Sequence, residues 1–210
     1  MDVSPLTLNR LSVYLRCLRR LSDDGIARVS SQQFARQFRL SATQIRKDLT
    51  HFGEFGIRGV GYEVEPLIGR LSEVLGVDQR HAVAVIGMGN LGSALARHVG
   101  TAQGPFTVAA GFDNDPDKIG ETVGDLVVRP ISDIPATVPA LDIRIGILAV
   151  PGHVAQDTYD RLVAAGIRSI LNFAPVRLIK ADGVHTRNVD LRIYLEELVF
   201  YLGQSTGDAA

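Results

Sequence analysis

A glycine-rich stretch in the middle of the chain has the spacing of a dinucleotide-binding turn. Gly87-Met-Gly-Asn-Leu-Gly92 directly follows an apolar segment, 82–86, and opens a segment with helical periodicity, 90–99. In such a turn the first glycine allows a tight bend, the second admits a pyrophosphate, and the third allows close helix–strand packing. The phosphates then bind the free N–H groups of the helix N-terminus. We therefore predict a dinucleotide site formed by Gly87, Met88, Gly89, Asn90, Leu91 and Gly92.

An acidic residue stands where this kind of site requires one. Asp113 ends the next apolar segment, 106–113, and in this position it would accept hydrogen bonds from the adenine-side ribose. Its charge would repel a 2′-phosphate, and no arginine follows in Asn114-Asp115-Pro116, so NAD is favoured over NADP. Val150-Pro151 and 172–175 end further apolar segments on the side of the sheet where a nicotinamide would lie, although such ends are often simple turns. An empty scaffold, or one for another nucleotide, is the alternative.

A second set of candidate residues lies about forty positions earlier. Ser41-Ala-Thr-Gln44 opens a predicted helix whose apolar face carries Ile45, Leu49 and Phe52. Its opposite face carries residue types that contact phosphates and base edges, and Gln44 can pair with adenine. Arg58, at the tip of a glycine-rich hairpin, is suited to the minor groove. The predicted DNA contacts are Ser41, Thr43, Gln44, Arg46, Lys47, Thr50, Arg58 and Tyr62. The alternative is an ordinary helix with a solvated polar face.

The elements that position these residues indicate an α/β protein with two domains. Residues 1–78 contain a helix with leucines at 8, 11, 15 and 18, a second helix after Ser30, the helix after Ser41 and the hairpin. This order predicts a winged helix-turn-helix, followed by a helix from Glu65-Pro66 that we expect to connect the domains. Residues 79–189 alternate apolar strands with helices, which predicts a Rossmann-type parallel sheet.

The last predicted helix, 190–203, is apolar around most of its circumference, interrupted mainly by Arg192, Glu196 and Glu197. A helix of this kind must be buried, either on a partner surface or on its own sheet. The tail, 204–210, is expected to be loose.

Composition excludes several classes of protein. The first 60 residues hold ten Lys and Arg against five Asp and Glu, whereas residues 61–210 hold twelve against eighteen, which suits a polyanionic partner for the first part only. No apolar run reaches the ~18 residues of a membrane span, and no signal peptide is evident, so we expect a cytoplasmic protein. Cys17 is the only cysteine and is expected to pack in the core. The five histidines lack metal-ligand spacing, so no metal site is predicted.

The run from Gln44 to Tyr62, together with Gly87-Met-Gly-Asn-Leu-Gly92 and Phe112-Asp-Asn-Asp115, closely resembles the Rex family of redox-sensing transcriptional repressors. The resemblance covers nearly the whole chain. It implies a homodimer whose C-terminal helices are exchanged between subunits. It also implies that the protein binds a palindromic operator, that NADH releases it and that NAD⁺ permits DNA binding.

The resemblance further implies a switch at the start of the last helix. Asp190 would engage Arg16 in the DNA-competent state and turn toward His98 when NADH is bound. Family members often carry tyrosine at the position of His98, so this chain departs from the pattern there. Leu191 and its helical neighbours would close the nicotinamide end of the pocket. Because burying the positively charged oxidised ring in an apolar pocket is costly, such a pocket would favour NADH.

Two rival functions use the same scaffold. An NAD-dependent oxidoreductase is disfavoured, because only twenty-one residues follow position 189 and no Tyr-x-x-x-Lys pair is present. A regulator that binds CoA or another nucleotide is the second rival, against which Asp113 argues by favouring a ribose diol. The sequence therefore predicts a regulator, not an enzyme.

Overall fold

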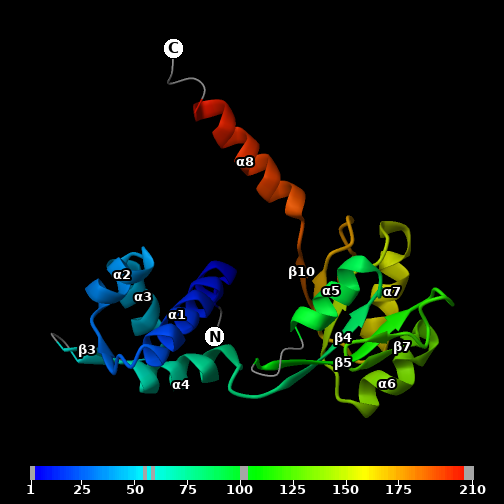
Figure 1. The fold of residues 1–210 in the computed structure, drawn as a ribbon, viewed down its shortest axis with the longest axis horizontal. Helices are drawn as coiled ribbons and strands as arrows, with labels where there is room; N and C mark the ends of the chain where they lie inside the picture. The colour runs from blue at the N-terminus through cyan, green and yellow to red at the C-terminus, as the bar shows by residue number, and fades with distance from the viewer. Residues whose placement is uncertain (1–2, 54–55, 58–59, 100–103, 206–210) are drawn as a thin grey trace. The chain divides into compact units, whose positions relative to one another are not determined.

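The computed structural model describes residues 3–53, 56–57, 60–99 and 104–205. The chain forms two compact units, Met1–Gln79 and Arg80–Ala210 (Figure 1). The sequence predicts the boundary one residue earlier, after position 78. Each unit has its own buried core.

The first unit consists of four helices and a small antiparallel sheet. Its elements are α1 (Pro5–Asp23), β1 (Arg28–Val29), α2 (Ser31–Phe38), α3 (Ala42–Phe52), β2 (Gly56–Ile57), β3 (Gly61–Glu63) and α4 (Val64–Leu75). The sheet has the order β1-β3-β2. This is the predicted winged helix-turn-helix with one additional strand, β1. A strand of only two residues leaves no alternating pattern in the sequence, so it was not predicted.

Short polar side chains set where the helices of this unit begin. Ser30 and Gln33 form the predicted capping box at the start of α2. Ser41 caps α3, its Oγ accepting from the backbone N of Gln44 at 3.3 Å. The core is made by apolar faces of all four helices, including α4, which packs on α1 and so belongs to this unit. Its largest fully buried side chains are Tyr14, Phe34, Leu11, Leu18, Leu21, Ile45, Leu49, Leu67 and Leu71.

The second unit contains a seven-stranded sheet of order β10-β9-β8-β4-β5-β7-β6, parallel except for the pairing of β6 with β7. Its strands are β4 (His81–Ile86), β5 (Phe106–Asp113), β6 (Thr122–Val123), β7 (Leu126–Pro130), β8 (Ile145–Leu148), β9 (Ser169–Asn172) and β10 (His185–Asn188). Its helices are α5 (Asn90–Val99), α6 (Ile134–Ala140), α7 (Gly152–Ala164) and α8 (Leu191–Ser205), with a 3₁₀ turn at Ile131–Asp133.

The central strand β4 is buried on both faces. Ala84 and Ile86 belong to one apolar cluster and Val83 and Val85 to another, so the two clusters lie on opposite sides of the sheet. β4 pairs with β5 on one side and β8 on the other, and this reversal of strand order opens a crevice at the carboxyl ends of the strands. The turn that begins at Gly87 therefore stands where such folds bind ligands.

Helix α8 differs from every other long helix because its large apolar side chains are exposed. From Leu191 to Leu202 these side chains are 54–68 % exposed. The helix is thus apolar around its circumference, as the sequence predicts, but in the single chain its own sheet does not cover it. Among the described residues, no helix is both long enough and apolar enough to span a membrane. The predicted loose tail falls mostly outside the described residues, since α8 continues to Ser205.

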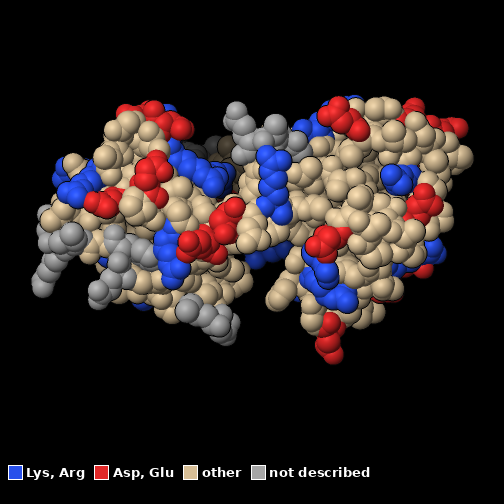
Figure 2. Space-filling view, turned by 90° about the horizontal axis from the view of Figure 1, so that it is seen from below, with Lys and Arg blue, Asp and Glu red and all other residues tan. Residues whose placement is uncertain are grey.

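Charge is mixed on the face that Figure 2 shows. Lys and Arg side chains lie interspersed with Asp and Glu side chains there, and neither sign forms a continuous patch on it.

Candidate functional site

The three glycines of the predicted turn have the local geometry that their roles require. Gly87 has φ +89°, a conformation that favours glycine, and a Cβ there would collide with the carbonyl oxygen of Ala149. A Cβ at Gly92 would overlap the carbonyl oxygen of Gly87, so this glycine lets α5 pack on the turn. A Cβ at Gly89 would meet nothing within 4 Å, so there is open space for a ligand.

The carboxylate of Asp113 is held beside this turn by backbone donors. Only 5 % of the residue is exposed. Its Oδ2 accepts from the backbone N of Met88 at 2.7 Å, and its Oδ1 accepts from the backbone N of Asn114 and Asp115 at 2.8 and 3.0 Å. The side chain of Met88 is itself buried against Gly111, so it supports the turn and does not line the pocket. Asp113 therefore has a fixed orientation at the carboxyl end of β5.

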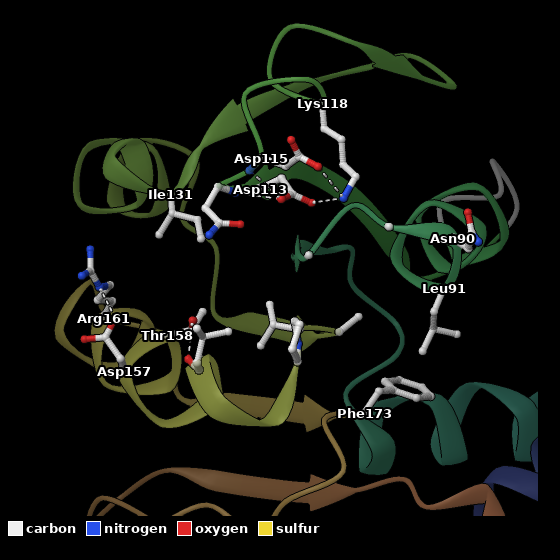
Figure 3. Close-up of a pocket in the computed structure, with 17 residues that line it drawn as sticks. Asn90, Leu91, Asp113, Asp115, Lys118, Ile131, Asp157, Thr158, Arg161 and Phe173 are labelled. Atoms are coloured by element: carbon white, nitrogen blue, oxygen red, sulfur yellow. Dashed lines mark hydrogen bonds and ion pairs between the residues drawn. The ribbon is translucent and has the colours of Figure 1, made fainter.

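A pocket of about 630 Å³ lies along this edge of the sheet (Figure 3). Gly92 lies behind the turn and does not line it. Asp113, Asp115 and Lys118 gather on one side, Asp157, Thr158 and Arg161 on another, and Leu91 lies near Phe173. The predicted residues that line it are Gly87, Gly89, Asn90, Leu91, Asp113, Val150 and Pro151.

Several lining residues were not predicted. Lys118 Nζ lies 3.6 Å from Asp113 Oδ2 and 3.3 Å from Asp115 Oδ2. A cation thus does follow Asp113, although it lies beyond the three residues that come directly after it. The carboxylate of Asp115 raises the pKa of Lys118. On α7, Arg161 pairs with Asp157 at 2.9 Å. The i, i+4 spacing on a helix was a signal for the Asp157–Arg161 pair, whereas Asp115 and Lys118 lie in a turn, where this spacing has no such meaning.

A second pocket, of about 510 Å³, adjoins the first, since Leu91 and Phe173 line both. Leu191 and Asp190 line this second pocket and not the first. Asp190 also caps α8, because its Oδ1 accepts from the backbone N of Arg192 at 2.9 Å. The predicted residue Leu191 therefore stands next to the dinucleotide-type pocket at the root of α8.

Helix α3 presents its predicted polar face to solvent. Arg46, Lys47 and Thr50 are exposed, as are Ser41 and Thr43. Arg46 donates to Ser31 Oγ at 2.8 Å and to Thr43 Oγ1 at 3.3 Å, which holds its guanidinium beside the start of α2. Arg58 lies outside the described residues.

Two of the predicted DNA contacts, Tyr62 and Gln44, also have partners inside the first unit. Tyr62 is only 9 % exposed and packs in the core of the first unit. Gln44 is half-buried, and its Nε2 donates to Asp48 Oδ1 at 2.7 Å. One N–H of its amide is thus bonded inside the unit. The sequence pattern did not reveal the bond between Gln44 and Asp48, because an aspartate on the polar side of a helix is ordinarily solvated.

Asp48 is the centre of a buried polar cluster that joins α3 to α1. The residue is 4 % exposed, and Arg10 donates to both of its oxygens, from Nε at 2.6 Å and from Nη2 at 2.8 Å. Tyr14 Oη donates to Asp48 Oδ2 at 3.0 Å. Burial alone would raise the pKa of Asp48, but the hydrogen bonds from Arg10, Gln44 and Tyr14 outweigh it and lower that pKa. Burial, followed by the bond to Asp48, raises the pKa of Tyr14 to about 12.

Replacing Asp48 with asparagine is expected to lower the free energy of unfolding at pH 7 by roughly 2–4 kcal/mol, because Arg10 and Tyr14 lose a charged acceptor. A carboxylate with a lowered pKa stabilises the fold above its unfolded pKa, about 4, and this contribution is lost as pH falls through the folded value. Urea unfolding of the parent and the variant should therefore differ at pH 7, and the difference should shrink as the pH is lowered below about 4. The exposed Asp78→Asn variant is the control, and an equal loss in both variants would contradict the cluster's role.

The residues of the predicted switch are all accessible. Arg16 is exposed on α1 in the first unit, whereas His98 on α5 and Asp190 before α8 are exposed in the second. Cys17 beside Arg16 is half-buried against the core, and burial raises the pKa of its thiol, which suits packing. Within the described part of the chain, no three His, Cys, Asp or Glu side chains are grouped so that they could hold a metal ion.

Comparisons with known proteins agree with this division of the chain. Residues 78–176 match the family described as "CoA binding domain", and residues 2–50 match the family described as "Putative DNA-binding protein N-terminus". The chain is 44 % identical over 209 residues to the redox-sensing transcriptional repressor Rex of Pelotomaculum thermopropionicum, covering 100 % of this chain and 98 % of the relative. It is 45 % identical to the Rex repressor of Carboxydothermus hydrogenoformans, covering 92 % and 93 %.

Solved structures resemble it over the same length. The crystal structure of RSP in complex with β-NAD⁺ and operator DNA has a TM-score of 0.92 and 35 % identity, and covers 100 % of both chains. The structure of RSP in complex with β-NADH has a TM-score of 0.86 and 34 % identity, and covers 98 % of this chain and 97 % of that one. RSP is described as a Rex-family repressor. The chain thus belongs to the Rex family of redox-sensing transcriptional repressors.

Proposed function

We propose that this protein represses transcription by binding operator DNA as a homodimer and that NADH releases it. The observation that carries the proposal is the full-length likeness to RSP, whose structures contain NAD⁺ with operator DNA in one case and NADH in the other. The protein is a regulator and not an enzyme, as its close relatives are. Its place of action would be the cytoplasm, where the DNA is, and it would need no metal.

The pocket in the second unit fits a nicotinamide dinucleotide. The open space at Gly89 and the start of α5 at Asn90 would receive the pyrophosphate, since the first turn of a helix leaves N–H groups unpaired. Asp113 would accept from the adenine-side ribose, and Val150, Pro151 and Phe173 would lie along the nicotinamide. When bound, this cofactor supplies a ring whose charge depends on its redox state. An apolar wall disfavours the charged, oxidised ring and so favours NADH.

The first unit supplies the DNA contacts. Arg46 and Lys47, exposed on α3, would reach phosphates and base edges in the major groove. Two such helices related by a two-fold axis need inverted half-sites, so a palindromic duplex selected by the parent protein from a randomised library is a suitable probe. We refer to it below as the selected duplex.

Helix α8 would join the two subunits. Its exposed apolar side chains need a cover, and a second copy of the chain supplies one of matching extent. The exchange of this helix between subunits, which the family resemblance implies, fits that requirement.

The switch would act through Arg16, Asp190 and His98. Asp190 would pair with Arg16 when DNA is bound and turn toward His98 with NADH, and a histidine there could make the response depend on pH near neutrality. An ion pair made only in the DNA-competent state shifts the equilibrium between that state and the NADH-bound state by the energy of the pair alone. Losing the pair should therefore weaken DNA binding only modestly.

Arg16→Ala is expected to weaken binding of the selected duplex without NADH by roughly two- to fivefold, the range of an exposed ion pair. Affinity for NADH should be equal or higher, because the competing DNA-competent state is weakened. Fluorescence anisotropy of labelled duplex measures the affinity for DNA and the NADH concentration that releases it, and NADH fluorescence measures the affinity for NADH. Arg19→Ala on the same helix is the control. If the Arg16 variant binds the duplex normally and releases it at the parent's NADH concentration, this residue is not part of the switch.

A thermal-shift series with NADH, NAD⁺, NADPH and CoA, each alone, tests the function itself. We expect NADH to raise the melting temperature most, since at equal concentration the ligand that binds the folded state most tightly stabilises it most. The match of residues 78–176 to the CoA binding domain makes CoA the informative rival. Stabilisation by CoA without stabilisation by NADH would contradict the proposal.

A further inference from the structure

A buried amide at the end of β9 joins the wall of the cofactor-type pocket to the root of α8. Asn172 is 0 % exposed. Its Nδ2 donates to the carbonyl oxygen of Val176 at 3.0 Å and to Asn188 Oδ1 at 3.0 Å, with the Ala174 carbonyl more distant at 3.4 Å. Its Oδ1 accepts from the backbone N of Ala174 at 3.0 Å. The amide oxygen is thus bonded to the 173–176 segment, and the amide nitrogen is bonded both to that segment and to the side chain of Asn188.

These bonds fix which way both amides face. Because Oδ1 of Asn172 accepts from a backbone N–H, its Nδ2 must face the other side, where Asn188 lies. Asn188 must therefore present an acceptor. A side chain that accepts a hydrogen bond can serve at position 188, whereas one that cannot accept breaks the link.

The 173–176 segment belongs to the pocket. Phe173 lines both pockets, and Val176 lines the second. Val176 Cγ1 also stands so near Gly152, the first residue of α7, that a Cβ on that glycine would lie 2.8 Å from it. Gly152 directly follows Pro151, which lines the main pocket. A ligand that displaces Phe173 or Pro151 therefore acts on the segment that Asn172 holds.

The other segment leads directly into α8. The backbone N of Val189 donates to the carbonyl oxygen of Asn172 at 2.8 Å, and the next residue, Asp190, caps α8. Only Val189 and Asp190 separate Asn188 from the first turn of the helix. Asn172 is thus connected to the start of α8 by two hydrogen bonds, one between its side chain and that of Asn188 and one between its backbone carbonyl and the N–H of Val189.

Strand pairing alone does not need this amide. Asn172 and Asn188 are already partners in the parallel ladder between β9 and β10. A buried amide is costly unless all its groups are bonded, and an apolar side chain would pack at this position without that cost. The amide adds a bond between the side chain of Asn188, at the end of the ladder, and the 173–176 segment that lies beyond it.

We propose that the Asn172–Asn188 pair is a positioning device that couples occupancy of the pocket to the orientation of α8. The inference rests on the proposed function, because it assigns a path for the effect of NADH on DNA binding. Neither residue needs to touch the DNA, and the readout is the coupling between the two ligands.

The test compares the NADH dissociation constant of the full-length protein with and without the selected duplex, followed by NADH fluorescence. The ratio of the two constants is the coupling factor. Asn188→Ala changes the exposed member of the pair, so the buried amide stays in place. We expect this variant to bind NADH alone within about threefold of the parent, and its coupling factor to fall about five- to tenfold, as loss of one hydrogen bond allows.

Two further variants separate coupling from structure. Asn188→Asp keeps an acceptor for Asn172 Nδ2 and should restore most of the coupling, whereas Arg187→Ala, exposed on the same strand, should leave it unchanged. Thermal unfolding is measured for each variant. A coupling factor in Asn188→Ala equal to that of the parent overturns the inference, as does an equal loss in Asn188→Asp. If the parent itself shows no coupling, the proposed function fails, and this inference fails with it.

Discussion

Replacing Asp113 with alanine will weaken NADH binding by about ten- to a hundredfold, the range for loss of hydrogen bonds to a charged group. In the proposed complex this carboxylate accepts from the ribose, and in the structure it also accepts from the backbone N of Met88. The variant therefore lacks a bond to the ligand and part of the support of the turn. Titration of NADH fluorescence measures the loss of affinity. Lys118→Ala is the matched change in the same cluster and should have the smaller effect, since its ammonium is shared with Asp115.

Asp113 should also set the preference for NADH over NADPH. Its charge opposes a 2′-phosphate, and Lys118, 3.6 Å away, is partly neutralised by it. Removing the carboxylate leaves Lys118 with only Asp115 as an anionic partner, so the preference for NADH should shrink in Asp113→Ala. The double variant Asp113→Ala/Lys118→Ala should regain part of the preference for NADH over NADPH. If the parent protein bound NADH and NADPH equally well, the role given to Asp113 would be wrong.

The double variant Arg46→Ala/Lys47→Ala should bind the selected duplex more than about a hundredfold more weakly, because each side chain that reads a base edge contributes about 1–3 kcal/mol. The slope of log affinity against log salt should flatten by roughly one for each phosphate that the variant no longer neutralises. Anisotropy titrations at several salt concentrations measure both quantities. NADH affinity should not change, since both residues lie in the first unit.

A control with the same change in charge is available in the second unit. Arg144 and Lys180 are exposed there, and Arg144→Ala/Lys180→Ala removes two positive charges without altering α3. This control should keep the parent's affinity and salt slope. Unchanged duplex binding by the folded Arg46/Lys47 variant would remove α3 from the DNA interface.

The sequence predicted the features that repeat along the chain and those that a single residue type defines. Gly87 and Gly92 were identified correctly, because a positive φ and a close backbone approach leave little choice of side chain. The apolar strand 82–86 and the face of α3 formed by Ile45 and Leu49 were equally legible from periodicity. The order of helices and strands followed from these patterns.

The features that were missed depend on contacts between distant residues. Asp48 carries the same charge as a surface aspartate, and only its bond to Arg10, thirty-eight positions away, makes it a core residue. The bond from Gln44 to this buried aspartate was missed for the same reason, and the contact of Gln44 with DNA stays a prediction. Strands β6 and β7 and helix α6 are short, and two prolines in α6 obscure its periodicity. Asn172 stood in a recognised strand end, but its three-way bonding could not be read from the neighbouring residues.

The exposed apolar side chains of α8 also bear on the order of events during synthesis. Because translation proceeds from the N-terminus, the first unit and all seven strands of the sheet leave the ribosome before this helix does. This exposed apolar surface is therefore made after the segments that form the cores of both units. On a polysome, where nascent copies of one chain lie near each other, such a late apolar helix meets an identical partner surface sooner than it would after dilution into the cell.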